Sequence, residues 1–187
     1  RDDTEVVVNL CIDFLENRTD KKTVDLCSGS GAIAVALDKI SGAKVTAVEI
    51  DETAFSYLET NVKENNSSVK PVMADALEIC DTFADGELDL IVSNPPYIKS
   101  ADIETLQKEV QLEPRLALDG GEDGCDFYRE IVSRWSRKLK KGGALAFELG
   151  ENQADAVKAL MAEQGFSDFK ISLDFGGVQR AIIGTLL

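Results

Sequence analysis

Residues 93–97, Ser-Asn-Pro-Pro-Tyr, place an amide, two prolines and an aromatic ring directly after an apolar run. Proline fixes φ and keeps the preceding residue out of the helical region, which predicts an extended backbone at Asn94 and Pro95 with free carbonyl groups. The Asn94 side-chain oxygen and the Pro95 carbonyl can accept the two hydrogens of a planar NH2 group, while Tyr97 covers its face. A rigid turn is the alternative, because Asn and Pro are ordinary turn residues.

A second candidate site is the turn at 28–31, Ser-Gly-Ser-Gly, between a strand pattern at 23–27 and the helix pattern of Ile33, Ala34, Leu37 and Ile40. Strand, glycine turn and helix open a nucleotide-binding βαβ unit. Its glycines admit a ligand close to the backbone, and the helix N-terminus offers unpaired N–H groups. A bare tight turn is the other interpretation.

Two acidic residues follow the next two predicted strands. Glu49 lies near the end of the strand at 44–50, roughly twenty residues after the glycines, where this architecture places an acid that accepts ribose hydroxyls. Asp75 comes directly after the strand at 69–74. The alternatives are a solvated charge at the rim of the sheet for Glu49 and an ordinary turn residue for Asp75. A strand at 88–94 then brings Asn94 to the same edge, because ligands of open α/β sheets bind at the carboxyl ends of the strands.

The remaining pattern predicts an α/β domain. Helices are expected at 4–17, 53–65, 126–139 and 152–164, and a buried strand at 144–149. The last strands, 169–173 and 181–187, are joined by a hairpin signal, so the final strand should be antiparallel in an otherwise parallel sheet. The long stretch at 98–123, which contains Glu113, is expected to be a mobile segment or a lid over the site.

Composition excludes several kinds of site. The 187 residues have a formal net charge of −14 and contain no histidine and four cysteines without a C-x-x-C pair, which excludes a Cys/His nucleophile and zinc sites of the usual spacing. Reduced, mostly buried thiols and a cytoplasmic location are therefore expected, with no metal and no membrane span. Nucleic acid is a disfavoured partner, because the basic cluster at 134–141 is interpreted as the solvated end of a helix.

The glycine turn also fits G-x-G-x-x-A, so a nicotinamide or flavin dinucleotide is an alternative ligand. The succession Asp25, Gly29-x-Gly31, Glu49, Asp75 and Asn94-Pro95-Pro96-Tyr97 instead resembles class I S-adenosylmethionine-dependent methyltransferases. Longer segments resemble the HemK-type release factor glutamine N5-methyltransferases over essentially the whole chain: Arg1-x-x-Thr4-Glu5, residues 25–34, residues 93–98, Glu113 to Leu118, and residues 119–124.

This resemblance implies a Rossmann-like fold with a mostly parallel seven-stranded sheet, an antiparallel last strand and helices on both faces. It implies S-adenosylmethionine as cofactor and S-adenosylhomocysteine as product. The expected cofactor residues are Asp25, Cys27, Ser28, Gly29, Ser30, Gly31, Glu49, Ile50, Asp75, Ala76 and Asn94. Catalysis is expected at Asn94, Pro95 and Tyr97, and glutamine binding at Asn94, Pro95, Pro96, Tyr97 and Glu113.

The expected partner is a peptide chain release factor, whose Gly-Gly-Gln glutamine accepts the methyl group. A ribosomal-protein glutamine, or an exocyclic amine of adenine or guanine after base flipping, are alternative acceptors. Members of the family carry a small helical domain ahead of the catalytic one, so residues 1–187, which begin without methionine, are expected to be the catalytic domain alone. Cys27 stands where the family often has glycine, and Ala76 where a bulkier residue often packs on the adenine.

Overall fold

The computed structural model describes residues 2–187, so Arg1 of the Arg1-x-x-Thr4-Glu5 segment lies outside the described residues. The seven strands of one sheet are β1 (Lys22–Leu26), β2 (Lys44–Glu49), β3 (Lys70–Met73), β4 (Leu88–Ser93), β5 (Leu139–Glu148), β6 (Phe166–Leu173) and β7 (Gln179–Leu186). The α-helices are α1 (Asp2–Leu15), α2 (Ala32–Ser41), α3 (Glu52–Glu64), α4 (Lys108–Gln111), α5 (Asp126–Trp135) and α6 (Ala154–Glu163). The expected alternation of strands and helices is confirmed.

The strand order is β3-β2-β1-β4-β5-β7-β6. β1 to β5 pair in parallel, whereas β7 is antiparallel to both β5 and β6, which confirms the predicted antiparallel last strand. The chain builds outward from β1 to β3 and then returns to place β4 on the other side of β1. This reversal between β1 and β4 is the position where open α/β sheets bind ligands.

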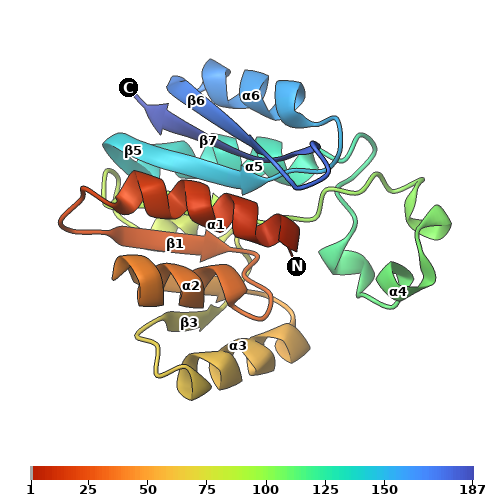
Figure 1. Ribbon diagram of the computed structural model, residues 1–187, viewed down its shortest axis with the longest axis horizontal. Coiled ribbons are helices and arrows are strands. Elements are labelled where there is room, and N and C mark those ends of the chain that lie inside the picture. The colour runs from red at the N-terminus through yellow and green to blue at the C-terminus, as the bar shows by residue number, and fades with distance from the viewer. Residues whose placement is uncertain (1) are drawn as a thin grey trace.

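Alternate residues of the central strands point to opposite faces, as the pleat of a strand requires. Leu90 and Val92 belong to the core beneath α1, α2 and α3, whereas Ile91 belongs to the core beneath α5 and α6. In Figure 1, α1 and α2 lie in front of the sheet and α5 lies behind it. Burial on both faces explains why the strands read as nearly continuous apolar runs.

Two predicted boundaries were wrong around the basic cluster at 134–141. The helix α5 ends at Trp135, a 3₁₀ turn covers Ser136–Lys138, and β5 begins at Leu139 rather than at residue 144. Gly142-Gly143, which was expected to separate the helix from the strand at 144–149, lies inside β5. Lys138 is 4% exposed, because its Nζ donates hydrogen bonds of 2.8 Å to the Phe83 carbonyl and to Asp85.

The stretch at 98–123 contains the 3₁₀ turns Ile103–Thr105 and Arg115–Ala117 as well as α4. It extends away from the sheet on the side towards which the parallel strands point (Figure 1). Its two ends are joined at the base by backbone hydrogen bonds: Ile98 N donates to Leu118 O at 2.9 Å, and Gly120 N donates to Ile98 O at 2.8 Å. Movement of this segment over the site stays a prediction.

Candidate active site

The ends of β1 and β4 bring the two candidate motifs together. The last paired residues of these neighbouring strands are Leu26 and Ser93, so Cys27 and Asn94 leave the sheet side by side. The buried hydroxyl of Ser93 donates a 2.8 Å hydrogen bond to the Leu26 carbonyl, which ties the two strand ends together. The glycine turn and the Asn-Pro-Pro-Tyr segment therefore share one site at the switch point of the sheet.

The turn after β1 depends on left-handed backbone conformations. Cys27 has φ 56°, Gly29 has φ 55° and Gly31 has φ 81°. A Cβ at Gly31 would lie 2.3 Å from Cδ1 of Leu58, whereas one at Gly29 would meet no atom within 4 Å. Gly31 thus permits the close packing of α2 and α3, and Gly29 faces open space in which a ligand can approach the backbone. The positive φ of Cys27 explains why glycine is suited to that position.

Two carboxylates surround the turn. Asp25 is fully buried in β1, where its Oδ2 accepts a 3.2 Å hydrogen bond from Ala34 N and its Oδ1 has no partner among the described residues. Burial, together with the charge of Glu49, raises the pKa of Asp25 to about 8. Glu49 is 8% exposed at the end of β2, and its Oε2 accepts a 2.7 Å hydrogen bond from Gly29 N. Burial and then the Glu49 charge also raise the pKa of the Cys27 thiol to about 12.

The segment after β3, residues 74–77, is held by hydrogen bonds within itself and to Trp135 of α5. Asp75 Oδ1 accepts a 2.7 Å hydrogen bond from Leu77 N, and the buried Trp135 donates through Nε1 to the Ala76 carbonyl at 2.9 Å. Ala76 is 7% exposed. Leu77 packs against the core beneath α5, whereas Ile50, which follows Glu49, is 47% exposed. Ile50 is thus the predicted cofactor residue with a large accessible apolar side chain.

The Asn94 side chain and the Pro95 carbonyl make no hydrogen bond to any other residue of the described chain, so both oxygens can accept. Pro95 and Pro96 are buried and Asn94 is half-buried. The Tyr97 hydroxyl donates to Glu148 Oε1 at 3.4 Å, and Oε2 of that carboxylate accepts a 2.8 Å hydrogen bond from Thr4 in α1. Glu148, at the end of β5 and 1% exposed, is a residue that sequence reasoning missed.

Glu113 lies in the extending segment around α4 and is half-buried. Its predicted role in glutamine binding stays a prediction.

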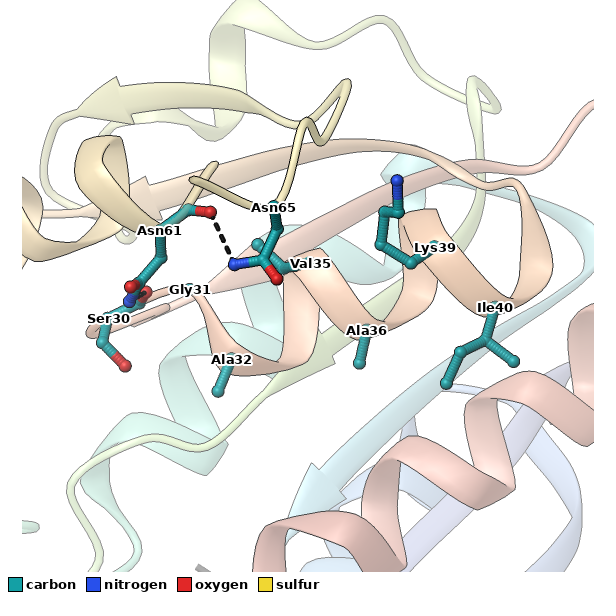
Figure 2. Close-up of a pocket in the computed structure, with 9 residues that line it drawn as sticks. All are labelled: Ser30, Gly31, Ala32, Val35, Ala36, Lys39, Ile40, Asn61 and Asn65. Atoms are coloured by element: carbon teal, nitrogen blue, oxygen red, sulfur yellow. Dashed lines mark hydrogen bonds between the residues drawn. The ribbon is translucent and has the colours of Figure 1, made fainter. Parts of the chain in front are cut away.

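A separate groove of about 370 Å³ lies between α2 and α3 (Figure 2). Its lining shares only Ser30 and Gly31 with the predicted cofactor residues and otherwise comes from the outer sides of the helices: Ala32, Val35, Ala36, Lys39, Ile40, Asn61 and Asn65. Asn61 Nδ2 donates a 2.9 Å hydrogen bond to the Ser30 carbonyl and so supports the turn from outside. This groove is not the site formed by Gly29, Glu49 and Asn94.

Comparison with known proteins identifies the family. The family model described as methyltransferase small domain matches residues 4–122. Proteins named release factor glutamine methyltransferase are similar over the whole chain. That of Geobacter sulfurreducens is 40% identical, covering 100% of this chain and 64% of the relative, and that of Bordetella pertussis is 34% identical, covering 100% and 68%. This chain belongs to the release factor glutamine methyltransferase family.

Another member of this release factor glutamine methyltransferase family, from Clostridium acetobutylicum, is 36% identical, covering 98% of this chain and 65% of the relative. The chain thus spans less than two thirds of the length of the Clostridium and Geobacter relatives. Among solved structures, a methyltransferase from Pyrococcus furiosus has a TM-score of 0.71 at 24% identity, covering 95% of this chain and 82% of that one. The hMettl16 catalytic domain in complex with a MAT2A 3'UTR hairpin has a TM-score of 0.71 at 17% identity, covering 96% and 69%. The predicted Rossmann-like methyltransferase fold is confirmed.

Other structural features of this family member bear on its chemistry. All four cysteines are free thiols and three are buried, as expected. Among the side chains that the structure describes, no three Cys, Asp or Glu groups are arranged to hold a metal ion. No helix in the described part of the chain is long and apolar enough to cross a membrane.

Proposed function

We propose that this protein transfers a methyl group from S-adenosylmethionine to the side-chain amide nitrogen of the glutamine in the Gly-Gly-Gln motif of a peptide chain release factor. The observation that carries the proposal is the pairing of Leu26 with Ser93, which sets the free acceptors of Asn94 and Pro95 beside the open turn at Gly29. The names of the curated relatives support the choice of substrate.

The residues of the turn fit such a cofactor. Open space at Gly29 accommodates a ligand against the backbone, and the fixed carboxylate of Glu49 suits ribose hydroxyls. The ammonium group in the methionine part of the cofactor would favour ionised Asp25, whose partnerless Oδ1 could then accept a hydrogen bond from it. Ile50, Asp75 and Ala76 would line the adenine, and residues 27–31 the methionine part.

When bound, S-adenosylmethionine supplies a methyl group on a cationic sulfur. A glutamine amide nitrogen is a poor nucleophile because its lone pair is delocalised. Asn94 and Pro95 would accept its two hydrogens, which raises the electron density on nitrogen and fixes its direction of approach. On the nitrogen held by Asn94 and Pro95, the lone pair would form the new N–C bond as the S–C electron pair returned to sulfur, and the nitrogen would then release its proton to water.

This chemistry needs positioning rather than a strong base, so it agrees with a chain that has no histidine. Tyr97 would cover the amide, with its hydroxyl held by the buried Glu148. Pro96 and Glu113 would complete the glutamine pocket. We further propose that residues 1–187 form the catalytic domain, and the cytoplasmic location stays a prediction.

A nucleic-acid amine is a weaker candidate acceptor. Affinity for nucleic acid comes mainly from accessible Lys and Arg, and the basic cluster at 134–141 is largely neutralised within the fold. Arg134 pairs with Glu130 at 2.7 Å, Arg137 pairs with Asp81, and Lys138 is buried beside Asp85. With a net charge of −14, electrostatics disfavour a nucleic-acid substrate.

The test is incubation of the purified full-length protein with a release factor and methyl-labelled S-adenosylmethionine, followed by mass spectrometry of the Gly-Gly-Gln peptide. We expect label on the glutamine, a loss of at least about 100-fold in rate for Asn94→Ala, and none for Asn9→Ala, which removes an exposed amide on α1. Absence of label with the unmodified protein, or equal rates with Asn94→Ala, would overturn the proposal.

A further inference from the structure

The side chain of Gln153 joins three segments that are distant in the sequence. It lies at the N-terminus of α6 and is 9% exposed. Its Nε2 donates hydrogen bonds to the carbonyl oxygens of Tyr97 at 2.9 Å and Gly124 at 3.2 Å, and its Oε1 accepts from Gly150 N at 3.0 Å. Both amide hydrogens and the amide oxygen are therefore in use, which fixes the orientation of the group.

Tyr128 of α5 supports this amide from behind. Its buried hydroxyl has one hydrogen, which it donates to the Glu148 carbonyl at 2.9 Å while lying 3.3 Å from Gln153 Oε1. The ring is fully buried and packs edge-on against Phe147, with centroids 5.1 Å apart. Helix α5 and strand β5 thus set the position of the Gln153 amide.

Gly124 and Gly150 allow Tyr97 and Gln153 to lie directly against the backbone. A Cβ at Gly124 would lie 2.5 Å from the Tyr97 carbonyl oxygen and 2.6 Å from Gln153 Nε2. One at Gly150 would lie 2.5 Å from Gln153 Oε1 and 2.9 Å from Cδ2 of Tyr97. These distances are shorter than a Cβ tolerates, so the wall behind Tyr97, formed by Gly124, Gly150 and Gln153, requires glycine at both positions.

We propose that Gln153 is a positioning residue for methyl transfer. By holding the Tyr97 carbonyl, it fixes the end of the Asn94-Pro95-Pro96-Tyr97 segment, whose two prolines transmit this position to the acceptors of Asn94 and Pro95. A primary amide is required there because it supplies two donors and an acceptor in one plane. This inference rests on the proposed function. It states that Gln153 holds the Asn94 and Pro95 oxygens in the positions where they would bind the substrate glutamine.

The decisive variant is Gln153→Glu, which keeps the shape and the acceptor but sets an oxygen against two carbonyls. We expect kcat to fall by about 100-fold, as misplacement by about an ångström does, while the Kd for S-adenosylmethionine changes by less than about 3-fold. Burial beside carbonyls raises the pKa of the introduced carboxyl, and its protonated form regains one donor. The ratio of variant kcat to unmodified kcat should therefore rise as the pH is lowered.

Gln153→Leu has no titrating group, so its kcat ratio should be low and independent of pH. Tyr128→Phe removes only the supporting hydroxyl and should lower kcat by about 3- to 10-fold with the fold retained. Ser136→Ala is the matched control, because Ser136 is also buried and donates to a carbonyl, that of Val132, outside the site. It should lower the melting temperature and leave kcat unchanged.

Equal kcat for the unmodified protein and Gln153→Glu would overturn this inference while leaving the proposed function intact. If Gln153 had only a structural role, kcat would fall in proportion to the melting temperature, and the ratio of Gln153→Glu kcat to unmodified kcat would not depend on pH. That result would also overturn the inference. Absence of transfer by the unmodified protein would overturn both proposals.

Discussion

The backbone N–H of Gly29 donates a 2.7 Å hydrogen bond to Oε2 of Glu49, which makes the glycine turn and the acid at the end of β2 one structural unit. Oε1 of the same carboxylate accepts from Ile50 N at 2.9 Å and Asp51 N at 2.8 Å. Three N–H groups therefore orient the side chain before any ligand binds. Since two of the four lone pairs are occupied on Oε1 and one on Oε2, a single acceptor position remains for a ribose diol.

The first prediction concerns the charge of Glu49. In Glu49→Gln, an NH2 group must face one of the three backbone N–H donors, and the charged acceptor for ribose is lost. Hydrogen bonds to charged groups contribute about 1.5–3 kcal/mol, so the Kd for S-adenosylmethionine should rise by roughly 10- to 100-fold. Isothermal titration calorimetry measures this change, with Glu59→Gln on the exposed side of α3 as the control. An unchanged Kd would remove Glu49 from the cofactor site.

The second prediction separates two glycines of the same turn. Gly31→Ala forces a Cβ to within 2.3 Å of Leu58 at φ 81°, so it should lower the free energy of unfolding by about 2 kcal/mol or more. Gly29→Ala meets no atom and carries only the backbone strain of φ 55°, about 1 kcal/mol, yet it fills the open space for the cofactor. Urea unfolding and calorimetry together should show stability loss mainly in Gly31→Ala and affinity loss in Gly29→Ala.

Local patterns predicted most of the fold because each strand and helix leaves a periodic signal. In the helix expected at 4–17, Val7, Leu10, Cys11 and Phe14 recur at helical spacing; the first three are buried and Phe14 is half-buried. The predicted ends of the strands also gave the positions of Glu49 and Asn94. The start of β5 was missed because Gly142 and Gly143 resemble a helix stop. The burial of Lys138, which pairs with a distant loop, has no local signal.

The support behind Tyr97 could not be predicted from the sequence for a similar reason. Gln153 contacts Tyr97 across 56 residues and Gly124 across 29, and Thr4 contacts Glu148 across 144. Such hydrogen bonds depend on tertiary structure and produce no spacing rule. The one local sign in the sequence is that Gly124 and Gly150 stand within four residues of Tyr128 and Gln153.

The third prediction concerns the pH dependence of stability. Because burial raises the pKa of Asp25 to about 8, the folded protein holds a proton there that the unfolded chain releases near pH 4. The stability from this group is fully present below about pH 4 and is lost as the pH rises towards about 8, by at most about 1.4 kcal/mol per pH unit. In Asp25→Asn this contribution is absent.

The free energy of unfolding of Asp25→Asn should therefore increase relative to that of the unmodified protein between about pH 5 and about pH 8. Urea unfolding of both proteins without cofactor measures the difference, in which all other titrating groups cancel. If the free energies of unfolding of the two proteins changed in parallel with pH, Asp25 would be ionised in the folded protein.

The fourth prediction tests the wall behind the Asn-Pro-Pro-Tyr segment from its other side. A Cβ at Gly120 would lie 2.7 Å from Cα of Tyr97 and 2.9 Å from the Pro96 carbonyl oxygen. These are backbone atoms that no rotamer change can move, so Gly120→Ala must shift the segment that carries Asn94. We expect methyl transfer to fall by about 100-fold with cofactor affinity retained, because the atoms nearest the added Cβ belong to Tyr97, Pro96 and Gly124 and not to the glycine turn. Gly86→Ala, at a loop glycine with no atom within 4 Å of its Cβ, is the control, and a normal transfer rate in Gly120→Ala would show that the acceptors tolerate displacement.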